Sequence, residues 1–392
     1  MQVVLLVIDS GGIGQARDAG DYGDIGSNTI AHTATAVGGL SLPFLGSMGL
    51  AHLVAIDGTP RNSLRGWAAV VNPKANGKDT LAGHWEMMGI TIKDPFQVFP
   101  QGFPQDVVED LVKAFGRPLL GNEVASGTEI MSRLGAEHMA TGYPIVYTSA
   151  DSVLQIAAHE AVVPIDQLYG WCEKARAIMT GPRLMGRIIA RPFEGVPGEF
   201  RRTANRRDFT VVPPAETMVD RLDQNGVETI AIGKIGDIFS GQGFSRWIHT
   251  ESNADGLDKT WQAMQEPIAQ PRFIFTNLVE FDSHYGHRRD ALGYAQALRE
   301  LDQWLPRLSS ALGPDDQLWI TADHGCDPTF HGTDHTRERV PWLAIGPQVF
   351  PGIGQERETL ADIAATLSDI FSVPAVGHGH AVAALDIPHK GA

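Results

Sequence analysis

The sequence contains very little cysteine. Its 392 residues include two cysteines, Cys172 and Cys326, which lie far apart in the chain. Two isolated thiols exclude a disulfide framework and provide none of the spacings that bind zinc through thiolates. We therefore expect a reducing, cytoplasmic environment and metal sites built without thiolate ligands.

Long hydrophobic runs are also missing. No stretch approaches the ~18 consecutive apolar residues that a membrane-spanning helix needs. The first apolar run, residues 3–8, is short, is not preceded by basic residues and ends at Asp9, which does not match the layout of a signal peptide. We expect a buried strand there, and we expect no membrane partner.

The chain has no excess of positive charge. It contains 31 Lys and Arg residues against 46 Asp and Glu residues, a formal net charge of −15. Nucleic-acid-binding proteins usually show the opposite balance, so we expect no nucleic-acid partner. An anionic substrate could still bind where metal ions or a few arginines concentrate positive charge. The 14 histidines, many of them near aspartates, point to metal ions.

The sequence lacks internal repeats and instead alternates apolar strand-like runs with helix-period stretches, which is typical of an α/β protein. Three continuous apolar runs predict strands of a parallel sheet covered on both faces: residues 3–8, 273–281 and 317–322. Acidic residues follow them: Asp9, Asp282, and Asp323 with its neighbour His324. Because ligands bind at the carboxyl edge of such sheets, these acids predict a functional site there.

A second domain is expected inside the first. Residues 95–205 have their own strand and helix signals, begin at a Pro- and Gly-rich passage and end near a basic loop without apolar periodicity. The predicted organisation is a core domain formed by residues 1–94 and 206–392, with an inserted cap domain over 95–205. Hinges near residues 94 and 206 would let the cap open and close.

Aspartates and histidines with short, regular spacings predict a metal centre. His287 follows Asp282 by five residues, and His335 follows His324 by eleven. The full candidate set is Asp9, Asp282, His287, Asp323, His324 and His335. Six oxygen and imidazole ligands suit two Mn²⁺, Zn²⁺, Fe²⁺ or Mg²⁺ ions better than one ion. Taken singly, each residue has an ordinary alternative as a helix N-cap or a solvated histidine.

The stretch GKDTLAGHWE, residues 77–86, places Thr80 between a flexible turn and the start of a predicted helix. One interpretation is that Thr80 is only a helix N-cap. The other is that its hydroxyl lies between two divalent ions, where it can ionise and attack phosphorus. The N-terminus of the helix would then help to hold the resulting phosphoryl group.

At these residues the chain resembles the phosphopentomutases, a family of the alkaline phosphatase superfamily. The matching stretches span nearly the whole chain: IDSGGIG, GSNTIAH, GKDTLAGHWEMMG, FQVFPQGFP, YTSADSVLQIAAHE, IIARPF, IGKIGDIF, FDSHYGHRRD and TADHGCDPTFHGTDHTRE. The resemblance implies an α/β fold with an alkaline-phosphatase-like core, whose mainly parallel central sheet is covered by helices, and an inserted α+β cap.

The resemblance also implies residue roles. Thr80 would be the phosphorylated nucleophile. One metal ion would be held by Asp282, His287 and His335, and the other by Asp9, Asp323 and His324. The family usually uses Mn²⁺ and is primed by a sugar bisphosphate. Substrate contacts are implied for Ser149, Asp151, Arg187 and Arg202 of the cap and for Lys234 of the core.

The chain departs from the family pattern in residues 17–24, at Ala82 and His331, and in its C-terminal tail. None of these departures removes a predicted metal ligand or Thr80. They leave open which sugar is preferred.

The implied activity is an isomerase that moves phosphate between C1 and C5 of ribose or 2-deoxyribose, through phospho-Thr80 and a 1,5-bisphosphate. A metal-dependent phosphohydrolase acting on sugar phosphates at the same site is the main alternative. A mutase acting on phosphoglycerate and an inactive metal-binding protein are weaker alternatives. The expected partners are small pentose phosphates, and the expected state is a monomer or a small homo-oligomer.

Overall fold

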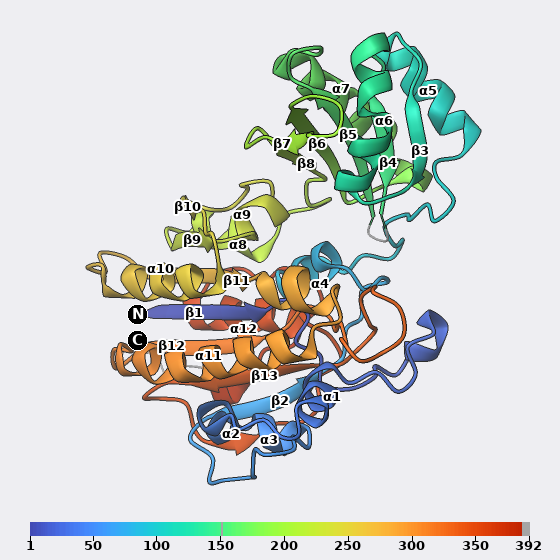
Figure 1. Ribbon diagram of the computed structural model, residues 1–392. Helices are drawn as coiled ribbons and strands as arrows, with labels where there is room; N and C mark the ends of the chain where they lie inside the picture. The colour runs from blue at the N-terminus through green and yellow to red at the C-terminus, as the bar shows by residue number, and fades with distance from the viewer. Residues whose placement is uncertain (150–151, 386–392) are drawn as a thin grey trace. The chain divides into compact units, whose positions relative to one another are not determined.

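The computed structural model describes residues 1–149 and 152–385 (Figure 1). These residues form two compact units, one made of Met1–Pro95 with Pro213–Ala392 and the other of Phe96–Val212. We call the first the core unit and the second the cap unit, and each is described by itself. None of the helices in the described ranges is long and apolar enough to cross a bilayer.

The core unit is built on an eight-stranded sheet among the described residues, with the strand order β10-β9-β11-β1-β12-β13-β2-β14. The strands are β1 (Gln2–Ile8), β2 (Trp67–Val71), β9 (Glu228–Ile232), β10 (Arg246–Ile248), β11 (Arg272–Leu278), β12 (Gln317–Thr321), β13 (Val340–Ile345) and β14 (Gly352–Ile353). Only β13 runs antiparallel to its neighbours within this described sheet. The predicted, mainly parallel sheet is therefore confirmed.

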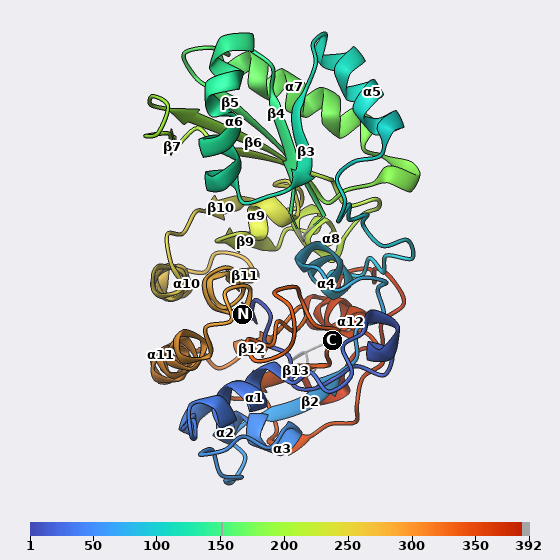
Figure 2. The same ribbon diagram turned by 45° about the vertical axis from the view of Figure 1, so that its right-hand side comes forward.

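Helices cover both faces of this sheet (Figure 2). One face is covered by α1 (Thr29–Ala36), α2 (Pro43–Met48), α3 (Leu50–Leu53), α10 (Asn253–Gln265) and α11 (Ala291–Ser310). The other is covered by α4 (Thr80–Met87), α8 (Met218–Gln224), α9 (Ile235–Ile238) and α12 (Ala361–Phe371). Because both faces are covered, the residues of β1, β11 and β12 are buried along the entire strands.

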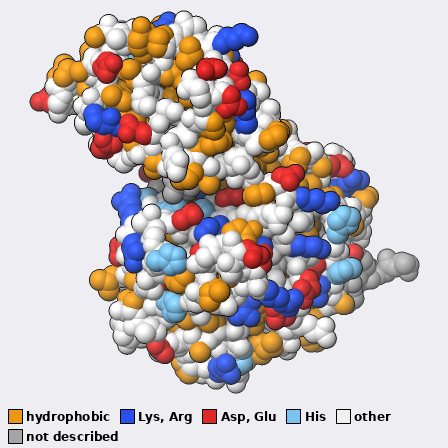
Figure 3. All heavy atoms as spheres, turned by 90° about the vertical axis from the view of Figure 1, so that its right-hand side faces the viewer, with side chains coloured by type: hydrophobic (Ala, Val, Ile, Leu, Met, Phe, Trp, Pro, Cys, Tyr) orange, Lys and Arg blue, Asp and Glu red, His pale blue; other side chains and the backbone are white. Residues whose placement is uncertain are grey.

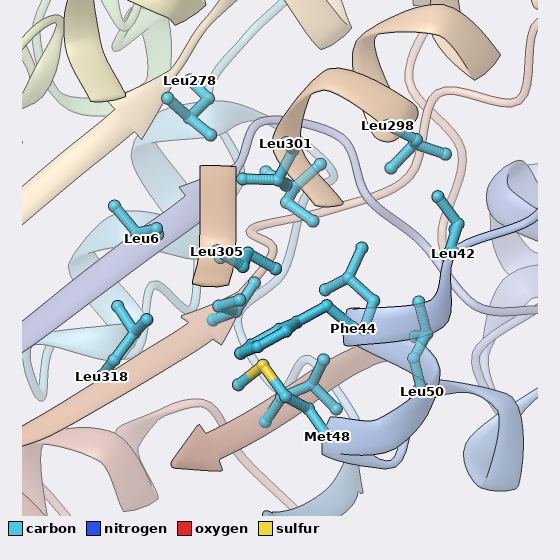
Figure 4. Packing of buried hydrophobic residues seen from close by; sticks show 14 of the residues in the cluster. Leu6, Leu42, Phe44, Met48, Leu50, Leu278, Leu298, Leu301, Leu305 and Leu318 are labelled. Carbon is cyan, nitrogen blue, oxygen red and sulfur yellow. The ribbon is translucent and has the colours of Figure 1, made fainter. Parts of the chain in front are cut away.

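Leucines dominate the first of these interfaces (Figure 4). Leu6, Leu278 and Leu318 project from β1, β11 and β12 into one cluster that also contains Leu298 and Leu301 of α11. The leucines of α11 recur at three- and four-residue spacing, so that one stripe of the helix faces the sheet. Burial of this apolar surface holds the strands in place and thereby fixes where their carboxyl ends lie.

The cap unit contains a six-stranded sheet among its described residues, with the order β3-β4-β5-β6-β7 and β8 paired to β6. Its strands are β3 (Leu120–Val124), β4 (Ile145–Thr148), β5 (Val153–His159), β6 (Arg187–Glu194), β7 (Arg201–Arg202) and β8 (Arg207–Thr210), and its helices are α5 (Gln105–Phe115), α6 (Gly127–Thr141) and α7 (Ile165–Ile178). The sheet mixes parallel and antiparallel pairs, as an α+β unit does.

The end of the cap unit differs from the boundary placed after residue 205 by sequence. Strand β8 lies beyond that residue and pairs antiparallel with β6, Arg187 lying opposite Thr210. The pairing ties residues 207–210 to the cap sheet, so the unit extends to Val212. Strand β8 has four residues and no apolar alternation, so the sequence carries no signal that the cap continues through it.

Both signs of charge are present on the surface. On the face shown in Figure 3, basic and acidic side chains are interspersed, so the net charge of −15 does not form one negative block there.

Candidate active site

Three neighbouring strands bring the predicted acids of the core unit together. Strand β1 lies between β11 and β12, with Ile8 opposite Leu278 and Val7 opposite Thr321. Because the three strands are parallel and in register, their carboxyl ends reach the same edge of the sheet. Asp9 follows β1 directly and Asp323 comes two residues after β12, and both side chains are almost completely buried.

Asp282 reaches the same edge by a different route than the sequence predicted. The apolar run was expected to be a strand through residue 281, but β11 ends at Leu278. Asp282 lies instead in a π-helix, Phe281–Gly286. The His287 N–H donates to the Asp282 carbonyl, 3.1 Å away, so these residues are one π-turn apart. Their side chains meet, with 3.4 Å between Asp282 Oδ2 and His287 Nε2.

The three predicted histidine ligands share one arrangement. In each ring Nδ1 faces a backbone carbonyl: Thr333 O at 2.6 Å from His287, Gly325 O at 3.0 Å from His324, and Lys78 O at 2.7 Å from His335. A carbonyl can only accept, so each Nδ1 carries the proton. This leaves the Nε2 lone pairs pointing into the site, which is the outer-shell pattern of metal-binding histidines.

Carboxylate oxygens meet these nitrogens. Three buried oxygens accept no hydrogen bond from any described residue: Asp9 Oδ1, Asp282 Oδ1 and Asp323 Oδ2. His335 Nε2 lies 3.2 Å from Asp282 Oδ1 and 3.1 Å from His287 Nε2. Neighbouring ligands of an ion with bonds of ~2.1 Å are themselves ~3.0–3.4 Å apart. Lone pairs that face one another at these separations fit divalent cations between them.

The ligand atoms fall into groups of the right size for such ions. Asp9, Asp323 and His324 offer atoms within 4.8 Å of one another, and so do Asp282, His324 and His335. Both groups consist of oxygen and imidazole nitrogen, the donors that suit Mn²⁺ and similar ions.

Without a cation, the cluster is strained electrostatically. Burial, and after it the neighbouring Asp323 carboxylate, raises the pKa of Asp9 to about 6. Burial would lower the pKa of His324, but the carboxylates around it, Asp323 foremost, raise it to about 10. Burial would also lower the pKa of His287, but the Asp282 carboxylate outweighs burial and raises that pKa to about 12. Protons thus take the place that positive ions would fill.

Thr80 is next to this cluster. It is the first residue of α4, is 8% exposed, and has its Oγ1 3.4 Å from His324 Nε2. The interpretation of Thr80 as an N-cap is wrong, because Asp79 is the N-cap and its side chain accepts from the Ala82 N–H at 3.1 Å. The threonine hydroxyl is therefore not engaged in capping.

Gly83 allows the helix of Thr80 to approach the metal cluster. A Cβ at this position would overlap the Asp323 carbonyl oxygen. Glycine therefore lets the first turn of α4 pack directly on the loop that carries Asp323 and His324. Any larger residue would push Thr80 away from His324.

Two residues that support the cluster were not predicted. His84, fully buried, has Nδ1 2.9 Å from the Thr80 carbonyl and 3.2 Å from Asp323 Oδ2. Asn277 donates from Nδ2 to Asp9 Oδ2 and to His84 Nε2, each 3.1 Å away. The pair links helix α4, which carries Thr80, to a predicted ligand of one ion. The signals were a histidine four residues after Thr80 and an amide inside the apolar run 273–281.

Lys234 joins the cluster from the core unit. It follows β9 and precedes α9, and its Nζ lies 3.6 Å from Asp9 Oδ2. The ammonium faces the acidic side of the site, where it can also attract a phosphate.

The remaining predicted contacts belong to the cap unit. Ser149 directly follows β4, and Arg187 begins β6 with its guanidinium 3.8 Å from Asp208 Oδ2. Because β4 runs antiparallel to β5 and β5 parallel to β6, Ser149 and Arg187 lie at one edge of the cap sheet. Asp151 lies outside the described residues.

Arg202 lies in β7 and extends toward a buried tyrosine. A Cβ at Gly127 of α6 would overlap both Arg202 Nη2 and Tyr147 Oη, so these groups converge at the start of that helix. Tyr147 is fully buried and its Oη has no hydrogen-bond partner among the described residues. Burial raises the pKa of Tyr147, and nearby Arg191, Arg202 and Arg206 oppose that rise. An unused hydroxyl among guanidiniums is suited to an anion.

Comparison with known proteins agrees with these features. Residues 1–375 match the model of the metalloenzyme superfamily. The chain is 50% identical over 380 residues to the phosphopentomutase of Alkaliphilus metalliredigens, covering 96% of this chain and 97% of that one.

The chain belongs to the phosphopentomutase family. It is also 49% identical over 380 residues to the phosphopentomutase of Carboxydothermus hydrogenoformans, with 96% of this chain and 97% of the relative covered. Among solved structures it is similar to the phosphoglycerate mutase of Leishmania mexicana, with 14% identity, a TM-score of 0.47 and 95% of each chain covered. As a phosphopentomutase family member the chain is an isomerase and a metalloenzyme.

Proposed function

We propose that the enzyme interconverts ribose or 2-deoxyribose 1-phosphate and 5-phosphate through a phosphothreonine at Thr80 and a 1,5-bisphosphate intermediate. The observation that carries this proposal is the placement of the Thr80 hydroxyl, free of capping and 3.4 Å from His324, beside a buried cluster of carboxylates and imidazoles. The family relationship supplies the substrate class.

Two divalent ions, for which we propose Mn²⁺, would be held by this cluster. Asp282, His287 and His335 would bind one ion and Asp9, Asp323 and His324 the other. When bound, the ions would neutralise the negative charge that spreads over the phosphoryl oxygens in the transition state.

The proposed reaction moves phosphoryl groups in two steps. In the first step the phosphoryl group passes from Thr80 Oγ1 to the free hydroxyl of the pentose monophosphate, which gives the 1,5-bisphosphate. In the second step Thr80 Oγ1 takes the other phosphoryl group, and the isomeric monophosphate is released. A sugar bisphosphate would prime the cycle by phosphorylating Thr80.

The N-terminus of α4 and Lys234 place positive potential where the transferred group would lie. Thr80 is the first residue of α4, at the positive end of the helix dipole, and the ammonium of Lys234 is close to Asp9. In the cap unit, we propose that Ser149, Asp151, Arg187 and Arg202 bind the sugar and its second phosphate. Arginine suits a phosphate because its planar donors can bind two oxygens together.

The cap would also have to exclude water, because water reaching phospho-Thr80 would turn the mutase into a phosphohydrolase. The test is to supply purified enzyme with Mn²⁺, ribose 1-phosphate and a sugar bisphosphate, and to measure ribose 5-phosphate and inorganic phosphate together. We expect isomerisation to be much faster than phosphate release. Phosphate release outpacing isomerisation would identify a hydrolase and overturn the proposal.

Parallel assays with 2-deoxyribose, hexose and phosphoglycerate substrates would define the specificity. A cytoplasmic location and a monomeric or small homo-oligomeric state stay predictions from the sequence.

A further inference from the structure

Cys326 is a buried thiol at the edge of the acidic cluster. It is 1% exposed and follows His324 by two residues. Its backbone N–H donates to Thr29 Oγ1 at 3.1 Å, and its Sγ lies 3.6 Å from the Asp334 carbonyl oxygen. A Cβ at Gly286, the last residue of the π-helix, would lie 2.8 Å from Sγ. The thiol is therefore held against the helix that carries Asp282.

Three different donor atoms converge at this point. Cys326 Sγ, a carboxylate oxygen of Asp282 and a ring nitrogen of His287 all lie within 4.8 Å of one another. The His287 ring is oriented by its Nδ1 hydrogen bond to the Thr333 carbonyl, the kind of outer-shell contact that metal-binding histidines make. Asp282 Oδ2 lies 3.4 Å from His287 Nε2. The set is one sulfur, one nitrogen and one oxygen.

This donor set differs in chemistry from the rest of the cluster. Thiolate and imidazole favour thiophilic ions such as Zn²⁺, Co²⁺ and Cd²⁺, whereas oxygen-rich sites suit Mn²⁺. Three protein ligands and one open position match the four-coordinate preference of zinc. The affinity order of the divalent ions also places Mn²⁺ below Co²⁺ and Zn²⁺ at most protein sites.

We propose that Asp282, His287 and Cys326 form an alternative metal site that captures thiophilic divalent ions. This inference rests on the proposed function in one respect, the assignment of Asp282 and His287 as metal ligands. When an ion binds, the sulfur–metal and nitrogen–metal bonds form, and the protons of the Cys326 thiol and of His287 Nε2 pass to the buffer. Asp282 also belongs to a second group, with His324 and His335. An ion at the alternative site would therefore compete with that group for the Asp282 carboxylate.

The consequence is a competition between ions. An ion ligated by Cys326 occupies two ligands that the proposed Mn²⁺ site requires, so the two occupancies exclude each other. Zn²⁺ and Cd²⁺ would inhibit the enzyme in competition with Mn²⁺ rather than in competition with the sugar phosphate.

The experiment loads the metal-free full-length protein with Co²⁺ alone and records its absorption spectrum. Bound Co²⁺ gives weak visible bands with any ligands, and a thiolate ligand adds a strong charge-transfer band in the near ultraviolet. We expect both features in the unchanged protein. Cys326→Ser should lose the charge-transfer band and keep the visible bands.

Cys172→Ala is the matched control. Cys172 is equally buried, lies in the cap unit, and belongs to none of the ligand groups found among the described residues. Its variant should keep both features. Inhibition by Cd²⁺ at fixed Mn²⁺ should be weakened at least tenfold in Cys326→Ser and unchanged in Cys172→Ala.

The outcomes separate this inference from the proposed function. Visible Co²⁺ bands without a charge-transfer band in the unchanged protein would overturn the inference and leave the oxygen and nitrogen centre intact. Absence of all Co²⁺ bands would overturn both. If Cys326→Ser fails to fold, ¹¹³Cd NMR of the unchanged protein decides, because a sulfur ligand moves the cadmium resonance strongly downfield and its absence would refute the site.

Discussion

The core unit and the cap unit hold their candidate functional groups in opposite ways. In the core unit, the carboxylates of Asp9, Asp282 and Asp323 are at most 4% exposed, and each histidine ring is fixed by a backbone carbonyl. In the cap unit, Arg202 is exposed and Arg187 is half-buried beside Asp208. The core groups have one geometry imposed by burial, whereas the cap groups are long cations near the surface.

The charges of the two sites differ in sign as well. In the core cluster, burial and mutual repulsion make the ionised form of the carboxylates unfavourable. Bound cations would stabilise the ionised form. The cap cluster gathers guanidiniums around the Tyr147 hydroxyl, so it is suited to an anion. Under the proposed function, the difference separates chemistry from recognition: the metal ligands come from the core sheet, and the cations that would bind the substrate come from the cap.

The largest expected effect concerns Thr80, the proposed nucleophile of the core unit. Thr80→Ala should lower kcat by about 10³-fold or more, because it removes the hydroxyl that we propose carries the phosphoryl group. Isomerisation of ribose 1-phosphate and metal content by atomic emission would be measured together. Metal content should be unchanged, because Thr80 is not among the six predicted ligands.

Thr80→Ser is the matched control, since it keeps the hydroxyl and should retain part of the activity. If Thr80→Ala isomerised at a rate near that of the unchanged enzyme, the assignment of the nucleophile would be wrong.

The second effect concerns metal removal, which should destabilise the core unit and not the cap unit. A ligand present at about 100 times its Kd stabilises a fold by about 2.7 kcal/mol, which corresponds to a shift of roughly 5–10 °C in the core transition. Calorimetry with chelator and with added Mn²⁺ would detect it. A transition that does not move with Mn²⁺ would contradict a core metal centre.

The sign of the pH dependence sharpens this test. In the metal-free protein the pKa of His324 is raised from 6.5 to about 10, so the stability it contributes is full below pH 6.5 and is lost toward pH 10. Mn²⁺ must displace that proton. The gain from Mn²⁺ should therefore be larger at pH 8 than at pH 6, and the reverse order would contradict the proton-for-metal exchange.

The third effect tests the supports of the core ligands. Asn277→Ala removes the donor that bridges Asp9 and His84, and it should weaken Mn²⁺ binding by about 10–100-fold. His84→Ala should act similarly, and the double variant should cost less than the sum because the two side chains form one network. Titration with Mn²⁺ gives the affinities. Fully additive losses would mean that the two residues act separately.

The smallest effect belongs to the cap unit. Arg202→Ala should raise the KM for ribose 1-phosphate by about tenfold, the loss of roughly one charge-assisted hydrogen bond, and leave Mn²⁺ affinity unchanged. Arg201→Ala is the matched control. Arg201 is the neighbouring residue in β7, and its side chain is 77% exposed and pairs with Glu194. Equal effects of the two substitutions would show that Arg202 has no special role.

The sequence alone determined the sheet and the identity of the metal-site candidates. Continuous apolar runs in residues 3–8 and 317–322 indicate buried parallel strands, because a strand covered on both faces needs no alternation of apolar and polar residues. Asp9 and Asp323 then follow at the sheet edge. The motif around Thr80 and the family resemblance identified the nucleophile candidate.

Only the tertiary structure decided how these groups meet. The π-helix that carries Asp282 and the capping by Asp79 are local, but the apolar pattern of the sequence carries no signal of either. The bridge from Asn277 to Asp9 joins segments 268 residues apart in the chain. The convergence of Cys326 with Asp282 and His287 is of the same kind. Local patterns report which residues prefer a strand or a helix, but the direction of a buried polar side chain is set by the partners that packing brings to it.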